Sequence, residues 1–172
     1  MNLKVLGIGA VLVVPLIVVL ALNISREPRF VSDNLDGTCP RLTGGFSTID
    51  ETSVDLDAIE GKAIVLNFWS TYCQSCELEH DDLVETRKLY EPRGVSFYGI
   101  MWHDTVPNAK NWLLSNTPAF PILVDPGDRL AVELGVSGVP ETFILDSEGC
   151  VQEKFIGAVS TEMLAAELEP LL

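Results

Sequence analysis

The apolar positions of the chain fall into short continuous runs that are separated by patterns of helical period. Continuous apolar runs of strand length predict buried strands over residues 63–69 and 95–102. Residues 121–125 are also strand-like, and residues 142–146 and 151–156 predict a hairpin. Helical patterns extend from the first strand to about residue 90 and recur over residues 108–115, 129–134 and 161–172. Strands that alternate with helices and end in a hairpin and a helix predict an α/β fold, with a central mixed β-sheet flanked by helices.

Turn and capping residues mark the ends of several predicted elements. Pro92 and Gly94 are expected to end the first helix, and Asp128 is the expected N-terminal cap of the helix over residues 129–134. A Ser-Glu-Gly turn joins the last two strands. The segment 41–62, with two adjacent glycines near its start, predicts a small hairpin and a turn that leads into the first long strand.

An uncharged apolar stretch occupies residues 5–22. As a helix it would measure roughly 27 Å, close to the roughly 30 Å of a bilayer core. The stretch is longer than the roughly 7–15 apolar residues usual for a signal peptide, which favours a retained membrane anchor over residues 1–22. A cleavable signal peptide is the alternative, because Val19-Leu20-Ala21 is a passable processing site.

The polar, turn-rich residues 23–37 predict a tether between this anchor and a single domain over residues 38–172. The chain carries 11 Lys and Arg against 25 Asp and Glu, a formal net charge of −14. Such an acidic surface is a poor partner for nucleic acid or for an anionic membrane surface, whereas it would attract a basic protein. The acidity equally serves solubility.

Cys73 and Cys76 stand between the first long strand and the helix that follows it. A Cys-x-x-Cys pair in this position indicates a redox dithiol, because both sulfurs reach bonding distance while the first lies at the helix N-terminus. There the free backbone N–H groups and the helix dipole stabilise a thiolate and can lower a cysteine pKa from roughly 8.5 to roughly 3.5–7.5. We therefore predict Cys73 as the attacking thiol and Cys76 as the resolving thiol.

Two other interpretations of these cysteines remain open. Cys73, Cys76 and His80 have the spacing of three metal ligands, but zinc usually takes a fourth ligand and a second Cys/His cluster downstream. The only other histidine, His103, stands alone. An ordinary structural disulfide is the second alternative. The redox interpretation requires no metal and no cofactor beyond the Cys73–Cys76 disulfide itself.

Two motifs together carry a resemblance to a known family. Residues 67–80 read Asn-Phe-Trp-Ser-Thr-Tyr-Cys-Gln-Ser-Cys-Glu-Leu-Glu-His, and residues 135–146 read Gly-Val-Ser-Gly-Val-Pro-Glu-Thr-Phe-Ile-Leu-Asp. The chain resembles, from about residue 60 to its C-terminus, the membrane-anchored thioredoxin-like proteins of cytochrome c biogenesis, the DsbE/CcmG family. The N-terminal anchor is also similar to that of the family. The resemblance implies a thioredoxin-like fold preceded by an N-terminal transmembrane helix.

The same resemblance implies a function and its partners. Proteins of this family are extracytoplasmic thiol-disulfide oxidoreductases that reduce the disulfide of the haem-attachment site of apocytochrome c. The implied partners are apocytochrome c and a membrane electron donor of the DsbD/CcdA type. The implied location is the bacterial inner membrane, as a single-pass protein with its soluble domain in the periplasm.

The resemblance also assigns residues that bind the substrate. Pro140 matches the cis-proline of the family, which lies beside the dithiol and lets the backbone of Val139 meet an extended substrate segment. Tyr72 stands where the family usually has tryptophan, and it keeps an aromatic flank beside Cys73. Glu141 matches the glutamate of the Pro-Glu-Thr motif, and it is expected to contact the substrate or to tune the site.

Glu79 is the expected proton-exchanging residue. It matches an acidic residue that the family carries on the helix, whereas Asn67 stands where ordinary thioredoxins have a buried aspartate. Residues three apart share a helix face, so a partly buried Glu79 can exchange a proton with Cys76 when the mixed disulfide resolves. The alternative is that Glu79 is one of several solvated acids. The pair between the cysteines, Gln-Ser, departs from the family's proline-containing pair and leaves the redox potential open.

Four further residues have no place in the motif. Cys39 and Cys150 either form a second, structural disulfide, which would suit an oxidising compartment, or remain separate thiols. Trp102 and His103 follow the second long strand, at the edge where functional loops gather in such sheets, and are expected to be core or rim residues.

Two rival functions remain. One is a general periplasmic disulfide reductase similar to ResA or TlpA, with the same chemistry and other clients. The other is a copper-binding chaperone of the Sco type, although Sco-like proteins separate their cysteines by three residues and use a distal histidine, whereas here no histidine follows His103. An oxidant of the DsbA type is disfavoured, because the stretch from Cys76 to Pro140 is short for its inserted helical domain.

Overall fold

The computed structural model describes residues 37–172, apart from residues 41, 43–44 and 57–60. The expected anchor over residues 1–22, and the tether up to residue 36, lie outside the described residues. Within the described ranges, no helix has both the length and the apolar character needed to cross a membrane.

The described residues form one sheet of seven strands in the order β2-β1-β5-β4-β3-β6-β7. Strands β3, β4 and β5 run parallel, and the other pairs are antiparallel. This confirms the predicted mixed sheet and the predicted hairpins, which lie at its two edges. The strands are β1 Phe46–Thr48, β2 Ser53–Val54, β3 Ala63–Trp69, β4 Val95–Met101, β5 Ile122–Val124, β6 Glu141–Asp146 and β7 Val151–Ile156.

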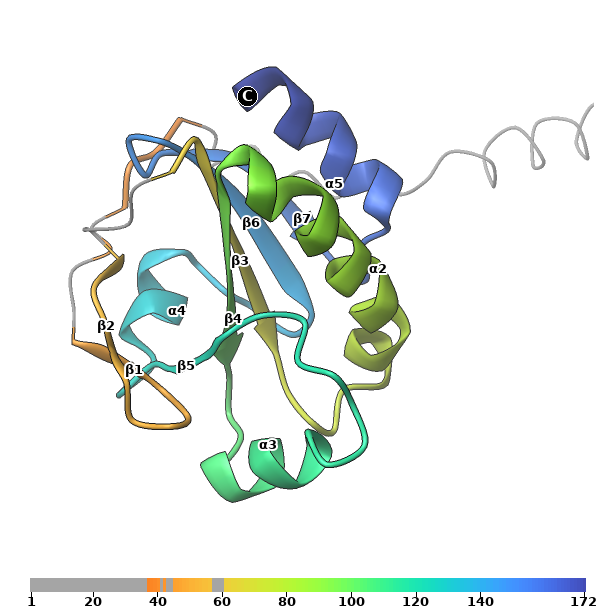
Figure 1. Ribbon diagram of the computed structural model, residues 1–172. Helices are drawn as coiled ribbons and strands as arrows, with labels where there is room; N and C mark the ends of the chain where they lie inside the picture. Colours follow the sequence, from red (N-terminus) through yellow and green to blue (C-terminus); the bar gives the residue numbers. More distant parts are fainter. Residues whose placement is uncertain (1–36, 41, 43–44, 57–60) are drawn as a thin grey trace, which may run out of the picture.

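Helices cover both faces of this sheet (Figure 1). The helices are α2 Gln74–Tyr90, α3 Val106–Trp112, α4 Arg129–Glu133 and α5 Thr161–Leu168, with short 3-10 helices η2 Glu91–Arg93 and η3 Glu169–Leu171. In Figure 1, α2 and α5 lie side by side against one face, and α4 lies against the other. The predicted helices are therefore all present, each displaced by a few residues at most from its expected bounds.

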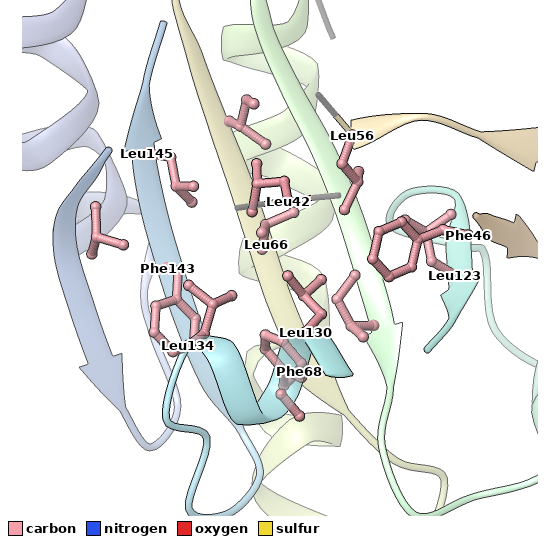
Figure 2. Packing of buried hydrophobic residues seen from close by; sticks show 14 residues of the cluster. Leu42, Phe46, Leu56, Leu66, Phe68, Leu123, Leu130, Leu134, Phe143 and Leu145 are labelled. Atoms are coloured by element: carbon pink, nitrogen blue, oxygen red, sulfur yellow. The ribbon is translucent and has the colours of Figure 1, made fainter. Parts of the chain in front are cut away.

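The core is divided by the sheet into two main layers, because successive side chains of a strand point to opposite faces. Ile64, Leu66 and Phe68 of β3 belong to the cluster on the α4 face, which Figure 2 shows from close by. Ala63 and Val65 belong to the cluster under α2 and α5. All residues of β3 are buried. This central strand ends directly before the Cys-x-x-Cys segment and thereby fixes the position of that segment.

The expected cap of helix α4 was wrong. Asp128 occupies the N-cap position, but its backbone is left-handed, with φ 53°, and its side chain makes no capping hydrogen bond. Asp125 performs that role, since its Oδ2 accepts a hydrogen bond from the backbone N–H of Ala131 over 3.0 Å. The side chain of Asp128 pairs with His103 at 3.4 Å.

Cys39 and Cys150 form a disulfide, which settles the pairing that the sequence left open. Beside it, residues 37 and 38 exchange backbone hydrogen bonds with Val151 of β7, over 2.9 and 2.8 Å. The bond joins positions separated by 111 residues. It therefore fastens the start of the domain to the end of the sheet opposite the Cys-x-x-Cys segment.

Candidate active site

Cys73 and Cys76 form a disulfide at the N-terminus of α2, with an S–S distance of 2.11 Å. Cys73 is the N-cap residue, and its Sγ accepts a hydrogen bond from the backbone N–H of Cys76 over 3.1 Å. Cys73 is half-buried, whereas Cys76 is buried. The more accessible sulfur is therefore the one that meets the helix N-terminus, which favours its thiolate when the bond is reduced.

The turn before the cysteines is fixed by two hydrogen bonds. The backbone N–H of Cys73 donates to the carbonyl of Ser70 over 3.2 Å. The N–H of Thr71 donates to Asp104 Oδ2 over 2.7 Å. Hydrogen bonds from Thr71, Asn108 and Thr105 lower the pKa of Asp104, although desolvation by burial, the largest single effect, opposes them. The loop after β4 thus supports the segment that carries the dithiol.

Glu79 lies one helical turn after Cys76 and is buried, with 1% of its surface exposed. Its Oε1 accepts a hydrogen bond from Asn67 Nδ2 over 2.9 Å. Its Oε2 accepts one from the backbone N–H of Val159, also over 2.9 Å. The amide of Asn67 donates in addition to Thr142 Oγ1 over 2.9 Å. Glu79 is therefore not a solvated acid, because donors from β3 and from the segment between β7 and α5 hold its carboxyl group in place.

Burial raises the pKa of Glu79 from 4.5 to about 7. Desolvation is the largest cause, and the nearby charge of Asp82 acts in the same direction. The hydrogen bonds from Val159 and Asn67 lower the pKa and only partly offset the burial. A carboxyl group with such a pKa changes its protonation near neutral pH, which a group that exchanges protons with a thiol requires.

The peptide bond between Val139 and Pro140 is cis, as expected. Val139 is half-buried and packs against the cluster that contains Cys76, as does Cys73. The carbonyl of Pro140 accepts a hydrogen bond from the N–H of Gly157 over 2.9 Å. The loop before β6 is thus brought to the dithiol.

The expectation that Glu141 binds substrate needs correction. Glu141 is fully buried, so it offers no surface to a substrate. Its Oε2 lies 2.9 Å from Lys154 Nζ, and its Oε1 accepts hydrogen bonds from the backbone N–H groups of Ser137 and Gly138 and from the Ser137 hydroxyl. The sequence motif had indicated the correct loop but not the direction of this side chain.

Tyr72 is exposed, with 63% of its surface accessible, which agrees with an aromatic flank beside Cys73. Trp102 is half-buried, and its ring stacks on that of His103 with the centroids 3.8 Å apart. Trp102 also donates its backbone N–H to the carbonyl of Trp69 over 3.0 Å. Trp102 and His103 therefore form part of the rim at this end of the sheet, as expected.

A pocket beside the disulfide was not predicted. It is lined by both cysteines, His80 and Trp112, among others. The ring of His80 meets the ring of Trp112 edge-on, with centroids 4.9 Å apart. His80 Nε2 lies 2.7 Å from the carbonyl oxygen of Thr117, which can only accept, so this nitrogen donates. No sequence signal distinguished Trp112, which stands at the end of a short helix, from an ordinary core residue.

Together these features define the class of the protein. A Cys-x-x-Cys disulfide begins a helix beside a cis-proline loop, on a mixed sheet with helices on both faces. This is the thioredoxin-like arrangement of thiol-disulfide oxidoreductases.

The chain belongs to the AhpC/TSA family, whose family model matches residues 38–154. It is 31% identical over 119 residues to the thiol:disulfide interchange protein HelX of Rhodobacter capsulatus, and the match covers 69% of this chain and 65% of HelX. It is 35% identical over 114 residues to DsbE of Pseudomonas aeruginosa, covering 66% of this chain and 61% of that protein. It is also 28% identical over 151 residues to the thiol-disulfide oxidoreductase ResA of Bacillus cereus, covering 87% and 79%. The chain thus spans somewhat less than two thirds of HelX and of this DsbE.

Solved structures share the fold. A thioredoxin family thiol:disulfide interchange protein from Chlorobium tepidum matches with a TM-score of 0.68 and 25% identity, covering 77% of this chain and 94% of that one. A secreted thiol-disulfide isomerase from Corynebacterium glutamicum matches with a TM-score of 0.68 and 22% identity, covering 84% and 97%. These likenesses cover most of this chain and nearly all of the two solved chains.

Proposed function

We propose that this protein is an extracytoplasmic protein-disulfide reductase whose client is the Cys-x-x-Cys-His haem-attachment site of apocytochrome c. One observation carries the proposal. The Cys73–Cys76 disulfide lies at a helix N-terminus, one turn from a buried carboxyl group whose pKa is about 7. A thiolate that attacks and a carboxyl group that exchanges a proton are the two groups that disulfide reduction needs.

The first step is the attack of the reduced protein on the client. The Cys73 thiolate attacks one sulfur of the client disulfide, which forms a mixed disulfide and releases the other client sulfur as a thiolate. The N–H of Cys76, which lies 3.1 Å from Cys73 Sγ, stabilises the thiolate before the attack. The buried Cys76 is protected from attack by other disulfides during this step.

The second step releases the client. Glu79 accepts the proton of the Cys76 thiol, and the resulting thiolate attacks Cys73. The Cys73–Cys76 disulfide forms, and the second client sulfur leaves as a thiolate that is protonated from solvent. The client has gained two electrons, and the protein has lost two. Asn67 and the Val159 N–H hold the Glu79 carboxyl group throughout.

The client is placed by groups around the dithiol. The backbone of Val139, before the cis-proline Pro140, meets an extended client segment, and Tyr72 packs against the client residue next to its cysteine. The pocket beside the disulfide accepts an adjacent side chain, and its aromatic walls favour an apolar or aromatic one.

The proposed setting is the bacterial inner membrane. Residues 1–22 anchor the protein in a single pass, and the domain works in the periplasm. A membrane protein of the DsbD/CcdA type returns two electrons to the Cys73–Cys76 disulfide after each cycle. The relatives HelX and DsbE are named thiol:disulfide interchange proteins, which supports the thiol-disulfide chemistry. The setting and the apocytochrome client rest on the resemblance of the two motifs to the DsbE/CcmG family.

A general reductase similar to ResA or TlpA is the second candidate, because the chain matches ResA over 87% of its length, the same share as it matches the DsbE of Allochromatium vinosum. The chemistry is the same, and only the clients differ. A Sco-like copper chaperone has weaker support, because two residues separate Cys73 from Cys76, whereas Sco-like proteins separate their cysteines by three. In the described ranges, no three side chains of His, Cys, Asp or Glu gather in a way that could hold a metal ion. Stoichiometric copper binding that is lost in His103→Ala would favour this third candidate.

A trapping experiment distinguishes these candidates. The variant Cys76→Ser, expressed in the native host, forms the mixed disulfide but lacks the thiol that resolves it. Mass spectrometry then identifies the captured proteins, with Cys73→Ser as the matched control that lacks the attacking thiol. Recovery of apocytochromes c and of a DsbD-like donor is the expected result. A varied set of periplasmic proteins without cytochromes would favour the general reductase, and no capture at all would contradict the proposal.

A further inference from the structure

The loop that precedes the cis-proline is held by a buried ion pair. Lys154 of β7 is 5% exposed, and its Nζ lies 2.9 Å from Glu141 Oε2. The same ammonium group donates to the carbonyl of Gly135 over 2.8 Å. It also lies 5.0 Å from the centroid of the Phe143 ring, in a cation–π contact. A lysine is almost never this deeply buried unless it is paired, so these contacts account for the burial of Lys154.

The ion pair contacts the loop between α4 and β6 at its start and in its middle. Lys154 holds Gly135 at the start of the loop, and Glu141 Oε1 accepts from the N–H groups of Ser137 and Gly138 over 3.0 and 3.1 Å. The Ser137 hydroxyl donates to the same oxygen over 2.5 Å. Side chains thus make the hydrogen bonds that a neighbouring strand would make elsewhere in the sheet. These hydrogen bonds also fix the position of Val139, because Val139 directly follows Gly138 in the chain.

A β-bulge directs Lys154 into this position. The pairing of β6 with β7 shifts register between Ile144 and Leu145, so that Glu153 pairs with Ile144 but Val151 pairs with Leu145. The extra residue reverses the alternation of faces along β7. Val151 and Lys154, three positions apart, therefore both point to the α4 face, where Val151 joins the core cluster and Lys154 meets Glu141.

We propose that Lys154 is a positioning residue, which acts through Glu141 to fix the backbone of Val139 for pairing with a client segment. The inference rests on the proposed function, because it assumes a polypeptide client that lies along this loop. Lys154 itself touches neither the client nor the reacting sulfurs. Its effect is therefore confined to clients that need the loop, and the chemistry of the dithiol does not depend on it.

The double variant Glu141→Leu/Lys154→Met tests this inference. Replacement of a buried ion pair by apolar side chains of similar volume often keeps a protein folded, whereas removal of one partner leaves a buried charge. The double variant keeps the core but loses every hydrogen bond from the pair to the loop. Lys88→Met is the matched control, because it makes the same chemical change at an exposed ion pair of α2.

Two disulfides serve as probes for the reduced protein. One is a synthetic peptide with an internal Cys-x-x-Cys-His disulfide, and the other is 5,5′-dithiobis(2-nitrobenzoate), which is too small to pair with the loop. We expect the rate constant for the peptide, relative to that for the small disulfide, to fall at least about tenfold in the double variant, and to stay at the wild-type value in Lys88→Met. An unchanged ratio in a folded double variant would overturn the inference.

Amide hydrogen exchange gives a second readout that does not depend on the client. The amides of Ser137 and Gly138 should exchange at least about tenfold faster in the double variant, whereas the amide of Trp102, bonded to Trp69, should keep its rate. If wild-type protein leaves the peptide oxidised, the proposed function fails, and the exchange rates alone decide on Lys154. Wild-type protection at Ser137 and Gly138 in the double variant would then refute its role.

Discussion

Two buried glutamates lie on opposite faces of the same sheet, and they have opposite surroundings. Glu79 is 1% exposed and Glu141 is 0% exposed. Glu141 and Thr142 are consecutive residues of β6, so their side chains point to opposite faces. Thr142 bonds to Asn67, which holds Glu79 on the α2 face, while Glu141 meets Lys154 on the α4 face. The two carboxyl groups thus differ in neighbours, although both are equally shielded from water.

The two carboxyl groups differ in whether a positively charged group lies beside them. Glu141 has a buried ammonium group and three further donors, which compensate its negative charge. Among the described residues, the carboxyl group of Glu79 has two neutral donors and no cationic partner. Asp82 adds an unfavourable charge, and the pKa of Glu79 rises to about 7. Glu141 therefore holds the loop before β6, whereas Glu79 is able to gain and lose a proton. Burial that no nearby cation compensates raises the pKa of a carboxyl group.

Removal of the cation from Glu141 should have the largest effect. In Lys154→Met, the buried carboxylate loses its partner, and we expect the free energy of unfolding to fall by about 3–5 kcal/mol. Urea unfolding at neutral pH measures this loss. The double variant Glu141→Leu/Lys154→Met should recover most of the stability, because it leaves no unpaired charge. A single variant as stable as the wild type would show that the ion pair does not compensate Glu141.

Glu79 should give stability a specific dependence on pH. The folded state holds the proton up to a pKa of about 7, whereas the unfolded chain releases it near 4.5. The folded state thus binds more protons between these values, so the free energy of unfolding falls as pH rises from 4.5 to about 7. The expected loss is about 3 kcal/mol. The difference between wild type and Glu79→Gln, measured by urea unfolding across this range, isolates the contribution, and a constant difference would contradict it.

The hydrogen bond from Asn67 should have a smaller effect. This bond lowers the pKa of Glu79, so Asn67→Leu, which removes the donor at similar volume, should raise that pKa further, by about one unit. A titration of the Glu79 carboxyl carbon by nuclear magnetic resonance measures the shift. Thr142→Val is the matched control, since it removes only the acceptor of the Asn67 amide. A titration midpoint that does not move in Asn67→Leu would show that this bond has no influence.

The sequence predicted the parts of the site that depend on local patterns. The strand before Cys73, the helix after it and the loop of Pro140 all follow from apolar runs, spacing and one motif. The burial of Glu79 also agreed with expectation, because a residue three positions after a buried cysteine lies on the same helix face. Resemblance to a family added the cis bond of Pro140, which no local pattern could have predicted.

Other features depend on distant pairing, and the sequence could not predict them. The sequence suggests that Lys154 is a solvated residue, because it follows the polar residues Gln152 and Glu153, whereas the bulge of β7 turns its side chain toward the α4 face. The direction of Glu141 depends on that lysine. Asp125 caps α4 in place of Asp128, because the turn between them places the nearer side chain toward His103. A tertiary contact, and not proximity in sequence, therefore determines which aspartate caps α4.

The central claim is that Glu79 accepts the proton of Cys76, and the pH dependence of the resolving step tests it most directly. Reduced protein is mixed with a peptide that carries a Cys-x-x-Cys-His disulfide, and release of the reduced peptide is followed by rapid quenching over a range of pH. The rate in the wild type should rise with pH through a midpoint near the Glu79 pKa of about 7. This rise should be absent in Glu79→Gln. The same profile in both proteins would contradict the claim and would leave Glu79 with no part in the proton transfer.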